Sequence, residues 1–356
     1  MKGESSMGKL RMGIIGAGGI AQDRHIPAFL KLANDVTVVA VCDVNETTAK
    51  AAAEKFNIEK VYTNYRDLFH DVDAVTICTP NKFHAEITIA ALDAGVHVLC
   101  EKPMAMNTDE CKAMIEARDR SGKVLSIAYH YRFMKDSQAA KNVIFENEIG
   151  TPIVARVQAL RRRKVPGWGV FTNKELQGGG SLIDYGCHFL DLSLWLLGSP
   201  KPVEVVGKTY NKLSKMPNQV NEWGSFNHET FDVDDHVTAF VRFDNGATML
   251  FETSWSANIK EDVERLSISG ETGGIDLFPF ELNQAKHGML FNSQATYIGG
   301  EDNPGLPQAQ NFIDACLGRD ELIVKPEEAL EVSRIMDGIY KSCETGQSIK
   351  FEVSGK

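Results

Sequence analysis

The fold is decided by residues 11–21, which read RMGIIGAGGIA. An apolar run leads into a cluster of glycines, and the chain then continues with the pattern of a helix start. Gly16, Gly18 and Ala21 occupy the three small-residue positions of G-x-G-x-x-G/A, a pattern that joins a buried strand to a helix. We expect Gly16 to permit a tight turn, Gly18 to let the backbone approach a ligand, and Ala21 to pack the helix on the strand.

This turn predicts a site for a dinucleotide pyrophosphate, because amides at a helix N-terminus face bound phosphates. The candidate cofactor contacts here are Gly16, Gly18, Gly19 and Ile20. A second apolar run ends before Asp43, where a carboxylate can bind the ribose 2′-hydroxyl and repel a 2′-phosphate. No Lys or Arg follows closely, so these residues favour NAD over NADP.

Up to about residue 130, apolar runs alternate with amphipathic helices, which predicts a parallel, doubly wound sheet. The expected strands are 10–15, 36–41, 74–78, 97–100 and 124–128. The expected helices are 20–32, 47–56, 65–68, 84–94 and 109–121.

After residue 130 the pattern changes to one helix, 135–147, followed by long β segments that predict an open, mostly antiparallel sheet. The expected strands are 153–163, 203–210, 236–243, 247–254 and 265–269. The turn at 244–246, Asp-Asn-Gly, predicts a hairpin between two of them. Two further helices, 307–317 and 326–345, are expected to cover part of this sheet.

These patterns predict an α/β protein of two domains. We expect a Rossmann dinucleotide-binding domain at 1–130 and an α/β domain for substrate binding and oligomerisation at 131–356. The chain of 356 residues is long enough for two cores.

The composition argues against several classes of protein. A formal charge of −10 argues against a nucleic-acid partner, and no apolar stretch is long enough to cross a membrane. Residues 1–9 are polar and lack the apolar core of a signal peptide. The seven cysteines are scattered without a C-x-x-C pair, so we expect a reduced, cytoplasmic protein without a metal site.

A second group of candidate residues lies on a segment, 181–197, that reads as a helix buried almost all round. Asp184 and His188 are four residues apart on it and share one face. Three glycines, 178–180, precede this helix and could let a ligand approach closely. Earlier in the chain, a strand end delivers Glu101-Lys102-Pro103 to the carboxyl edge of the first sheet, where ligands bind in such folds.

Together these motifs resemble the Gfo/Idh/MocA family, named for glucose–fructose oxidoreductase, inositol dehydrogenase and a rhizopine-catabolism protein. The resemblance covers essentially the whole chain and rests on four motifs in the same order. They are the turn at Gly16, Thr79-Pro80-Asn81 with His84, Glu101-Lys102-Pro103, and the glycines 178–180 followed by Asp184 and His188.

The resemblance implies an enzyme that oxidises or reduces a hydroxyl of a sugar or cyclic polyol with NAD(P). It places Lys102 beside the nicotinamide and the substrate oxygen, and Asp184 and His188 complete the site, with His188 as general base. It also implies a homodimer or homotetramer that assembles through the C-terminal sheet. We therefore expect Lys102 and the pair of helix residues to converge across an interdomain crevice.

The chemistry of these side chains agrees with those roles. The intrinsic pKa of a histidine suits the proton released by an alcohol, and Asp184 can orient the imidazole of His188. Lys102 can stabilise a developing alkoxide. The remaining cofactor candidates follow the strand ends of the first domain, and they are Thr79, Pro80, Asn81, His84 and Glu101.

Candidate substrate contacts come from two further segments. Arg132, flanked by aromatic residues, follows the last expected Rossmann strand, where an arginine-rich stretch at the site edge is common in the family. A basic run at 161–164 precedes Trp168. One interpretation of this basic run is a solvated edge of the protein. The alternative is that Arg163, Lys164 and Trp168 contact the substrate, with the indole on the sugar ring and the basic side chains on an acidic group of that sugar.

Three other functions stay open. One is an NAD-dependent glycosidase that uses transient oxidation to break a glycosidic bond. Another is a regulator that senses NAD without catalysis. The third is a reductase of a dihydrodiol, a bile pigment or an imine.

Overall fold

The computed structural model describes residues 9–352, and the chain forms two compact units. The first unit contains residues 9–104, 109–128 and 303–326, and the second contains residues 105–108, 129–302 and 327–352. Residues 303–326 therefore belong to the first unit, whereas a single boundary at residue 130 would assign them to the second domain. Most of the polar start, residues 1–8, lies outside the described part of the chain. Over the described residues, no helix has the length and apolar character needed to cross a membrane.

The first unit is built on a six-stranded parallel sheet with the order β3-β2-β1-β4-β5-β6. Its strands are β1 (Leu10–Ile15), β2 (Val36–Cys42), β3 (Lys60–Tyr62), β4 (Ala74–Ile77), β5 (His97–Cys100) and β6 (Leu125–Ile127). This is the order of a Rossmann fold, so the predicted doubly wound sheet is confirmed. Strand β3 was not predicted, because its residues are only partly buried and do not form an apolar run.

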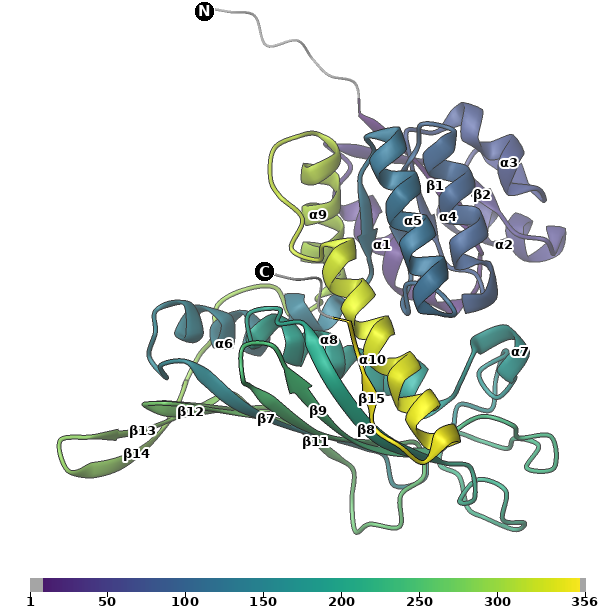
Figure 1. Cartoon of the computed structure of the whole chain (residues 1–356). Helices are drawn as coiled ribbons and strands as arrows, with labels where there is room; N and C mark the ends of the chain where they lie inside the picture. The colour runs from purple at the N-terminus through teal and green to yellow at the C-terminus, as the bar shows by residue number, and fades with distance from the viewer. Residues whose placement is uncertain (1–8, 353–356) are drawn as a thin grey trace, which may run out of the picture. The chain divides into compact units, whose positions relative to one another are not determined.

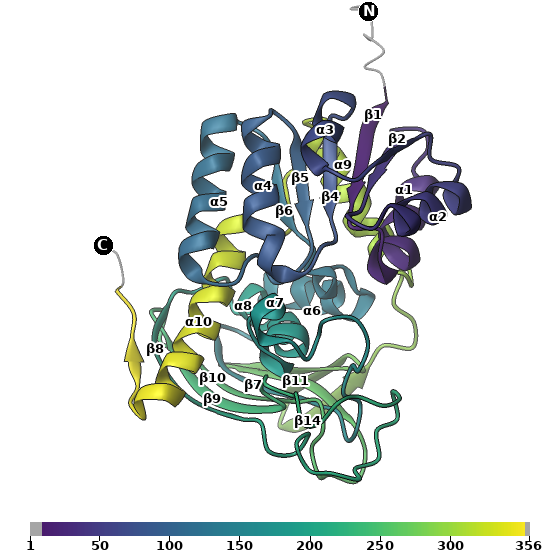
Figure 2. The same ribbon diagram turned by 90° about the vertical axis from the view of Figure 1, so that its right-hand side faces the viewer.

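Among the described residues, five helices of the first unit lie between these strands, whereas α9 follows most strands of the second sheet in the chain. Figure 2 shows α4 and α5 side by side along the sheet. The helices of this unit are α1 (Ile26–Lys31), α2 (Glu46–Phe56), α3 (Tyr65–Leu68), α4 (His84–Asp93), α5 (Thr108–Ser121) and α9 (Gly305–Cys316). The predicted helix 20–32 is irregular, because a π-helical segment, Ala21–His25, precedes α1.

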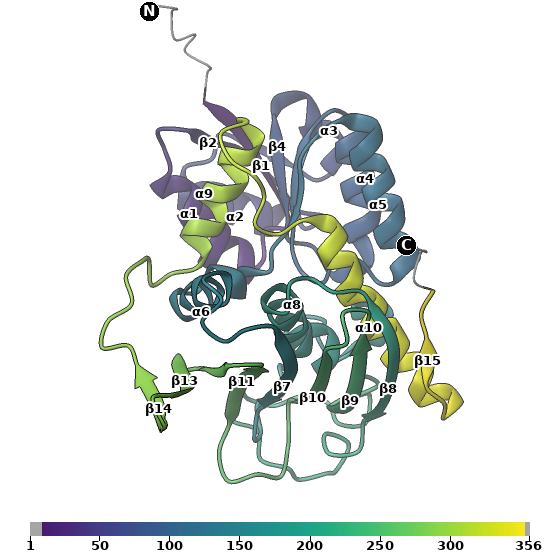
Figure 3. The ribbon, with the colours of Figure 1, turned by 60° about the vertical axis from the view of Figure 1, so that its left-hand side comes forward.

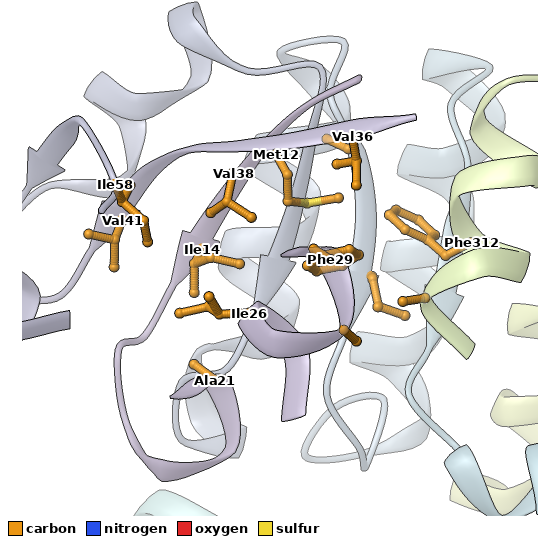
Figure 4. Packing of buried hydrophobic residues seen from close by; sticks show 14 of the residues in the cluster. Met12, Ile14, Ala21, Ile26, Phe29, Val36, Val38, Val41, Ile58 and Phe312 are labelled. Carbon is orange, nitrogen blue, oxygen red and sulfur yellow. The ribbon is translucent and has the colours of Figure 1, made fainter. Parts of the chain in front are cut away.

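The core of the first unit joins residues that are distant in the sequence. Met12 and Ile14 of β1 pack with Phe29 of α1, and Phe312 of α9 belongs to the same buried cluster (Figure 4). The expectation that the helix at 307–317 covers the C-terminal sheet is therefore wrong. Its apolar stripe predicts which face is buried, but a stripe does not specify the element against which it packs.

The second unit is built on a nine-stranded sheet with the order β14-β13-β12-β11-β7-β10-β9-β8-β15 (Figure 3). Its strands are β7 (Pro152–Leu160), β8 (Pro202–Tyr210), β9 (His236–Phe243), β10 (Thr248–Ser254), β11 (Val263–Gly270), β12 (Gly273–Leu277), β13 (Glu281–Lys286), β14 (Met289–Gln294) and β15 (Ile349–Lys350). Only the β7–β10 pair is parallel among the pairs of this sheet in the described chain, so the mostly antiparallel prediction is confirmed. The predicted hairpin joins β9 to β10.

Helices of the second unit lie on one side of its sheet, as Figures 1 and 3 show for α6, α8 and α10. They are α6 (Lys135–Phe145), α7 (Lys174–Gln177), α8 (Cys187–Leu196) and α10 (Pro326–Thr345). Helix α10 packs on β8, where a side chain at Gly207 would contact Ile339 at 3.0 Å. The prediction that the helix at 326–345 covers this sheet is therefore confirmed.

Candidate functional site

The glycine turn of the first unit has the geometry of a phosphate cradle. Gly16 has φ +90°, and a Cβ atom there would lie 2.6 Å from the carbonyl oxygen of Cys78, so only glycine fits. A Cβ at Gly18 would meet no heavy atom within 4 Å, and both Gly18 and Gly19 are exposed. The turn therefore leaves open space beside its backbone, while Ile20 is only partly exposed at the entrance to the π-helical segment.

Asp43 closes the other side of this turn. One of its carboxylate oxygens accepts a hydrogen bond from the amide of Ala17 at 2.9 Å, and the other accepts from the amide of Asn45 at 2.9 Å. Each oxygen of a carboxylate has a second lone pair, so the group can still accept hydrogen bonds from a diol. Asp43 is thus held at the turn in an orientation set by two backbone donors.

His84 links the ends of β4 and β5. Its Nδ1 lies 2.8 Å from the carbonyl oxygen of Pro103 and its Nε2 lies 2.9 Å from that of Thr79. Burial lowers the pKa of His84. Because both ring nitrogens face backbone carbonyls, the structure argues against the predicted contact of this ring with the cofactor. Thr79 and Pro80 are partly exposed and Asn81 is buried, and their cofactor contacts stay predictions.

Glu101 has a role that differs from the predicted cofactor contact. It is buried, one carboxylate oxygen lies 2.7 Å from Nε2 of His25, and the other accepts a hydrogen bond from the amide of Lys102 at 3.1 Å. It therefore ties the segment after the glycine turn to the strand end that carries Lys102. Burial alone would raise the pKa of Glu101, but the hydrogen bond from His25 and the charge of Arg24 hold it well below its ordinary value of 4.5.

This pair predicts a specific acid sensitivity. Since the pKa of Glu101 is lower in the folded than in the unfolded chain, the carboxylate stabilises the fold above about pH 4.5, and the stabilisation is lost as the pH falls toward about 2. We expect Glu101→Gln to lower the melting temperature near neutral pH and to flatten its dependence on pH in the acid range. Thermal unfolding followed by circular dichroism over that range measures both effects. The exposed carboxylate variant Glu54→Gln is the control, and equal pH dependence in the two variants would contradict the assignment.

In the second unit, one carboxylate anchors the segment that carries the predicted catalytic helix. Asp234 accepts hydrogen bonds from the amides of Gly180 at 2.8 Å and Leu182 at 2.9 Å, and from the hydroxyls of Ser181 at 3.0 Å and Tyr340 at 2.6 Å. These partners fix the start of the π-helical segment Leu182–Gly186, which leads directly into α8. Asp234 was not identified from the sequence, because it lies 54 positions from the glycine whose amide it binds, Gly180.

Two of the glycines before this helix are required for packing. A Cβ at Gly179 would lie 2.0 Å from the hydroxyl of Tyr340, and a Cβ at Gly180 would lie 2.0 Å from the carbonyl oxygen of Asp234. Gly178 and Gly179 also line a small cavity of about 220 Å³. Close approach of a ligand to these glycines stays a prediction.

His188 lies near the start of α8 with its side chain almost fully buried, at 6% exposure. Its ring stacks on Tyr131 with centroids 4.6 Å apart and an interplanar angle of 15°, and it meets the edge of His130 at 4.8 Å. The aromatic stack fixes the plane of the imidazole. A histidine held in this way has a defined direction for receiving a proton.

Asp184 occupies the π-helical segment and is partly exposed. Its Oδ2 accepts a hydrogen bond from the indole Nε1 of Trp255 at 3.1 Å and lies 3.8 Å from Nη1 of Arg161. These contacts orient the carboxylate from the sheet side. The predicted pairing of Asp184 with the imidazole of His188 stays a prediction.

Arg132 does not line the edge of a site. Its side chain is 0% exposed, it forms two hydrogen bonds to Asp191, at 2.9 and 2.6 Å, and it also pairs with Glu328. This buried pairing argues against the predicted contact with substrate. Asp191 is on α8, so the arginine joins the segment after β6 to the helix that carries His188.

The basic run at 161–164 is not a strand, because β7 ends at Leu160. Arg163 donates to Oδ1 of Asn258 at 2.5 Å, and Lys164 pairs with Asp262. Their positive charges are therefore engaged by neighbouring groups of the protein, although both side chains remain partly exposed.

Arg161 is the member of the basic run that lies beside Asp184, and it was not among the predicted contacts. Trp168, which was predicted, has 53% of its surface exposed. Only the turn geometry after β7 decides which of four adjacent basic residues faces the helix, and no pattern in the sequence predicts that turn.

Within residues 9–352, no group of three or more His, Cys, Asp or Glu side chains is arranged to hold a metal ion.

Comparison with known protein families identifies both parts of the chain. Residues 10–129 match the family model described as "Oxidoreductase family, NAD-binding Rossmann fold". Residues 137–276 match the one described as "GFO/IDH/MocA C-terminal domain". The two matches cover the residues that carry the glycine turn, Asp184 and His188.

Curated relatives include two sugar dehydrogenases. The chain is 35% identical over 353 residues to D-glucoside 3-dehydrogenase of Escherichia coli (strain K12), covering 98% of this chain and 100% of that protein. It is 30% identical over 317 residues to levoglucosan dehydrogenase of Pseudarthrobacter phenanthrenivorans, covering 82% and 79%. A crystal structure of levoglucosan dehydrogenase in complex with NADH has the same fold, with a TM-score of 0.83 and 23% identity over 97% of this chain and 100% of that one.

Proposed function

Because the chain belongs to the Gfo/Idh/MocA family of oxidoreductases, we propose that it is an NAD-dependent dehydrogenase that oxidises a ring hydroxyl of a D-glucoside. The match to D-glucoside 3-dehydrogenase over nearly the full length of both chains carries this proposal. The wider class, sugars and cyclic polyols, is supported by levoglucosan dehydrogenase and by inositol 2-dehydrogenase of Salmonella typhimurium (strain LT2), to which the chain is 35% identical over 192 residues, covering 53% of this chain and 54% of that protein. The substrate is expected to lie against Asp184 and His188, the two polar side chains that the second unit holds in place on one helix.

The residues of the first unit suit a dinucleotide. The open space beside Gly18 accommodates a pyrophosphate close to the backbone, and the fixed carboxylate of Asp43 can accept hydrogen bonds from a ribose diol. A carboxylate at that position repels a 2′-phosphate, which supports NAD over NADP. The bound nicotinamide supplies a hydride acceptor for the oxidation of the alcohol.

The side chains of this protein then handle the proton and the charge on the substrate oxygen. His188 accepts the proton of the hydroxyl, and its stacked ring keeps the accepting nitrogen in one direction. Asp184 stabilises the imidazolium, and Lys102 stabilises the negative charge that develops on the oxygen. These three roles, and the convergence of Lys102 with the other two, are proposals drawn from the family resemblance and from the chemistry of the groups.

We further propose a cytoplasmic homodimer or homotetramer that assembles through the nine-stranded sheet. Exposed apolar side chains on one face of two of its strands support such contacts, and they are Val206 and Leu250. Size-exclusion chromatography with light scattering measures the state of assembly.

The function is tested by mixing the purified protein with NAD and a panel of methyl glucosides, free hexoses and inositols. We expect the absorbance of NADH to rise with a glucoside, with a kcat/KM for NAD at least about tenfold above that for NADP because the carboxylate of Asp43 disfavours the 2′-phosphate. Mass spectrometry should find the product two hydrogens lighter with its glycosidic bond intact. Release of the free sugar without NADH would instead support the redox-assisted glycosidase, and NAD binding without any turnover would support a regulator.

A further inference from the structure

Two loops of the second unit bring three aromatic side chains together near Asp184. Trp168 lies 5.5 Å from Trp223, centroid to centroid, and 6.1 Å from Phe171. Trp168 and Trp223 have 53% and 36% of their surfaces exposed. We call these three residues the aromatic wall. Large indoles left this open to solvent are characteristic of ligand-binding surfaces.

The wall is built by specific contacts between the two loops. The side chain of Asn221 accepts a hydrogen bond from the amide of Val165 at 2.8 Å and donates one to its carbonyl oxygen at 2.9 Å. The amide of Glu222 donates to the carbonyl oxygen of Arg163 at 2.8 Å. These bonds flank Trp223 directly, so its position next to Trp168 is fixed by the backbone.

Arg161 joins the wall to the carboxylate of Asp184. Its guanidinium lies between the rings of Tyr185, at 3.9 Å, and Trp223, at 4.5 Å. Its Nη1 is 3.8 Å from Oδ2 of Asp184, too far for a hydrogen bond, and this buried atom has no hydrogen-bond partner among the described residues. A single guanidinium therefore separates Asp184 from the ring of Trp223, and it retains an unused donor.

We propose that the aromatic wall is a second subsite, which binds the ring of the glycoside that is not oxidised. The proposal rests on the function proposed above, since it places the reacting sugar at Asp184. The non-reacting group then stacks on Trp223 and Trp168, and Arg161 holds the ring of Trp223 in place. The aromatic wall is expected to bind a group with a flat or apolar ring face, and both an aryl aglycone and a second pyranose have one.

The subsite predicts that Trp223 discriminates among glucosides by their aglycone. For phenyl β-D-glucoside, we expect Trp223→Ala to raise KM about tenfold with little change in kcat, which is the scale of one lost ring contact. For methyl β-D-glucoside, KM should change less than about twofold, because the methyl group does not reach the wall. Cellobiose, compared with the phenyl glucoside, shows whether a second pyranose uses the same surface.

Two controls separate the subsite from general damage. Trp223→Phe keeps a ring and should restore most of the affinity for the phenyl glucoside, whereas Tyr297→Ala removes another exposed aromatic side chain and should change neither substrate. Equal effects of Trp223→Ala on the phenyl and methyl glucosides would overturn the proposal. Trp223→Ala can also change the oligomeric state. If it does so and leaves the KM and kcat for both glucosides unchanged, the aromatic wall is a contact between subunits and not a subsite.

A binding measurement distinguishes failure of the subsite from failure of the proposed function. Isothermal titration calorimetry of phenyl β-D-glucoside, with NADH present, measures binding without turnover. A saturable binding heat that Trp223→Ala abolishes supports the subsite even if no glucoside reduces NAD. If the protein oxidises glucosides and Trp223→Ala binds phenyl β-D-glucoside with wild-type affinity, the proposed function stands and the subsite is rejected.

Discussion

Replacement of His188 by alanine is expected to lower kcat by about 10² to 10⁴-fold, the usual contribution of a general base. The structure gives this residue the features that the role requires. Its ring is buried at the start of α8, and Tyr131 holds it by stacking at 4.6 Å. Steady-state NADH formation with a glucoside measures the loss, and the KM for NAD should stay near the wild-type value because the glycine turn is unchanged.

A structural role for His188 would give different results. Added imidazole should restore part of the activity of His188→Ala if the side chain transfers a proton, because the small base can enter the space that the ring leaves. The variant His188→Asn, which keeps a polar side chain but no base, should be as inactive as the alanine variant. A kcat close to that of the wild type in either variant would contradict the assignment.

The first sheet shows what a sequence pattern can predict. Buried parallel strands are continuous apolar runs, so β1, β2, β4, β5 and β6 were predicted to within a few residues. The second sheet was predicted less completely. Strands β13 and β14 carry polar residues on both faces, β13 is mostly partly buried and β14 is exposed throughout, so they lack the alternation that indicates a half-buried strand.

The site shows a second limit. The motifs single out candidate residues such as Asp43, Asp184 and His188, since each follows a recognisable turn or shares a helix face, and their roles stay predictions. The motifs do not predict partners that come from distant segments. Arg132 binds Asp191, 59 positions away, and Glu328, 196 positions away, so a residue that appeared available for substrate is an internal ion pair. Arg161 was not predicted as a site residue for the same reason, because its partners Asp184, Tyr185 and Trp223 come from distant segments.

The second large effect is expected at Asp234, which the sequence does not single out. Replacement by alanine removes the acceptor for two amides and two hydroxyls at the start of the segment that carries Asp184 and His188. Buried donors that lose a charged acceptor cost about 1–3 kcal/mol each, partly offset by relaxation and water. With a net loss of about 3 kcal/mol, we expect the melting temperature of the second unit to fall by roughly 6–12 °C.

Activity should fall together with stability in Asp234→Ala, because the Asp184 carboxylate is positioned by the backbone that Asp234 holds. Tyr340→Phe removes a single hydrogen bond of 2.6 Å and should give a small part of the effect, which tests whether the bonds act together. The control is Glu229→Ala, five residues away and exposed, where little change is expected. Thermal unfolding and kcat/KM, measured below the melting temperature of each variant, separate folding from positioning. Wild-type kcat/KM and stability in Asp234→Ala would show that the π-helical segment keeps its geometry without this anchor.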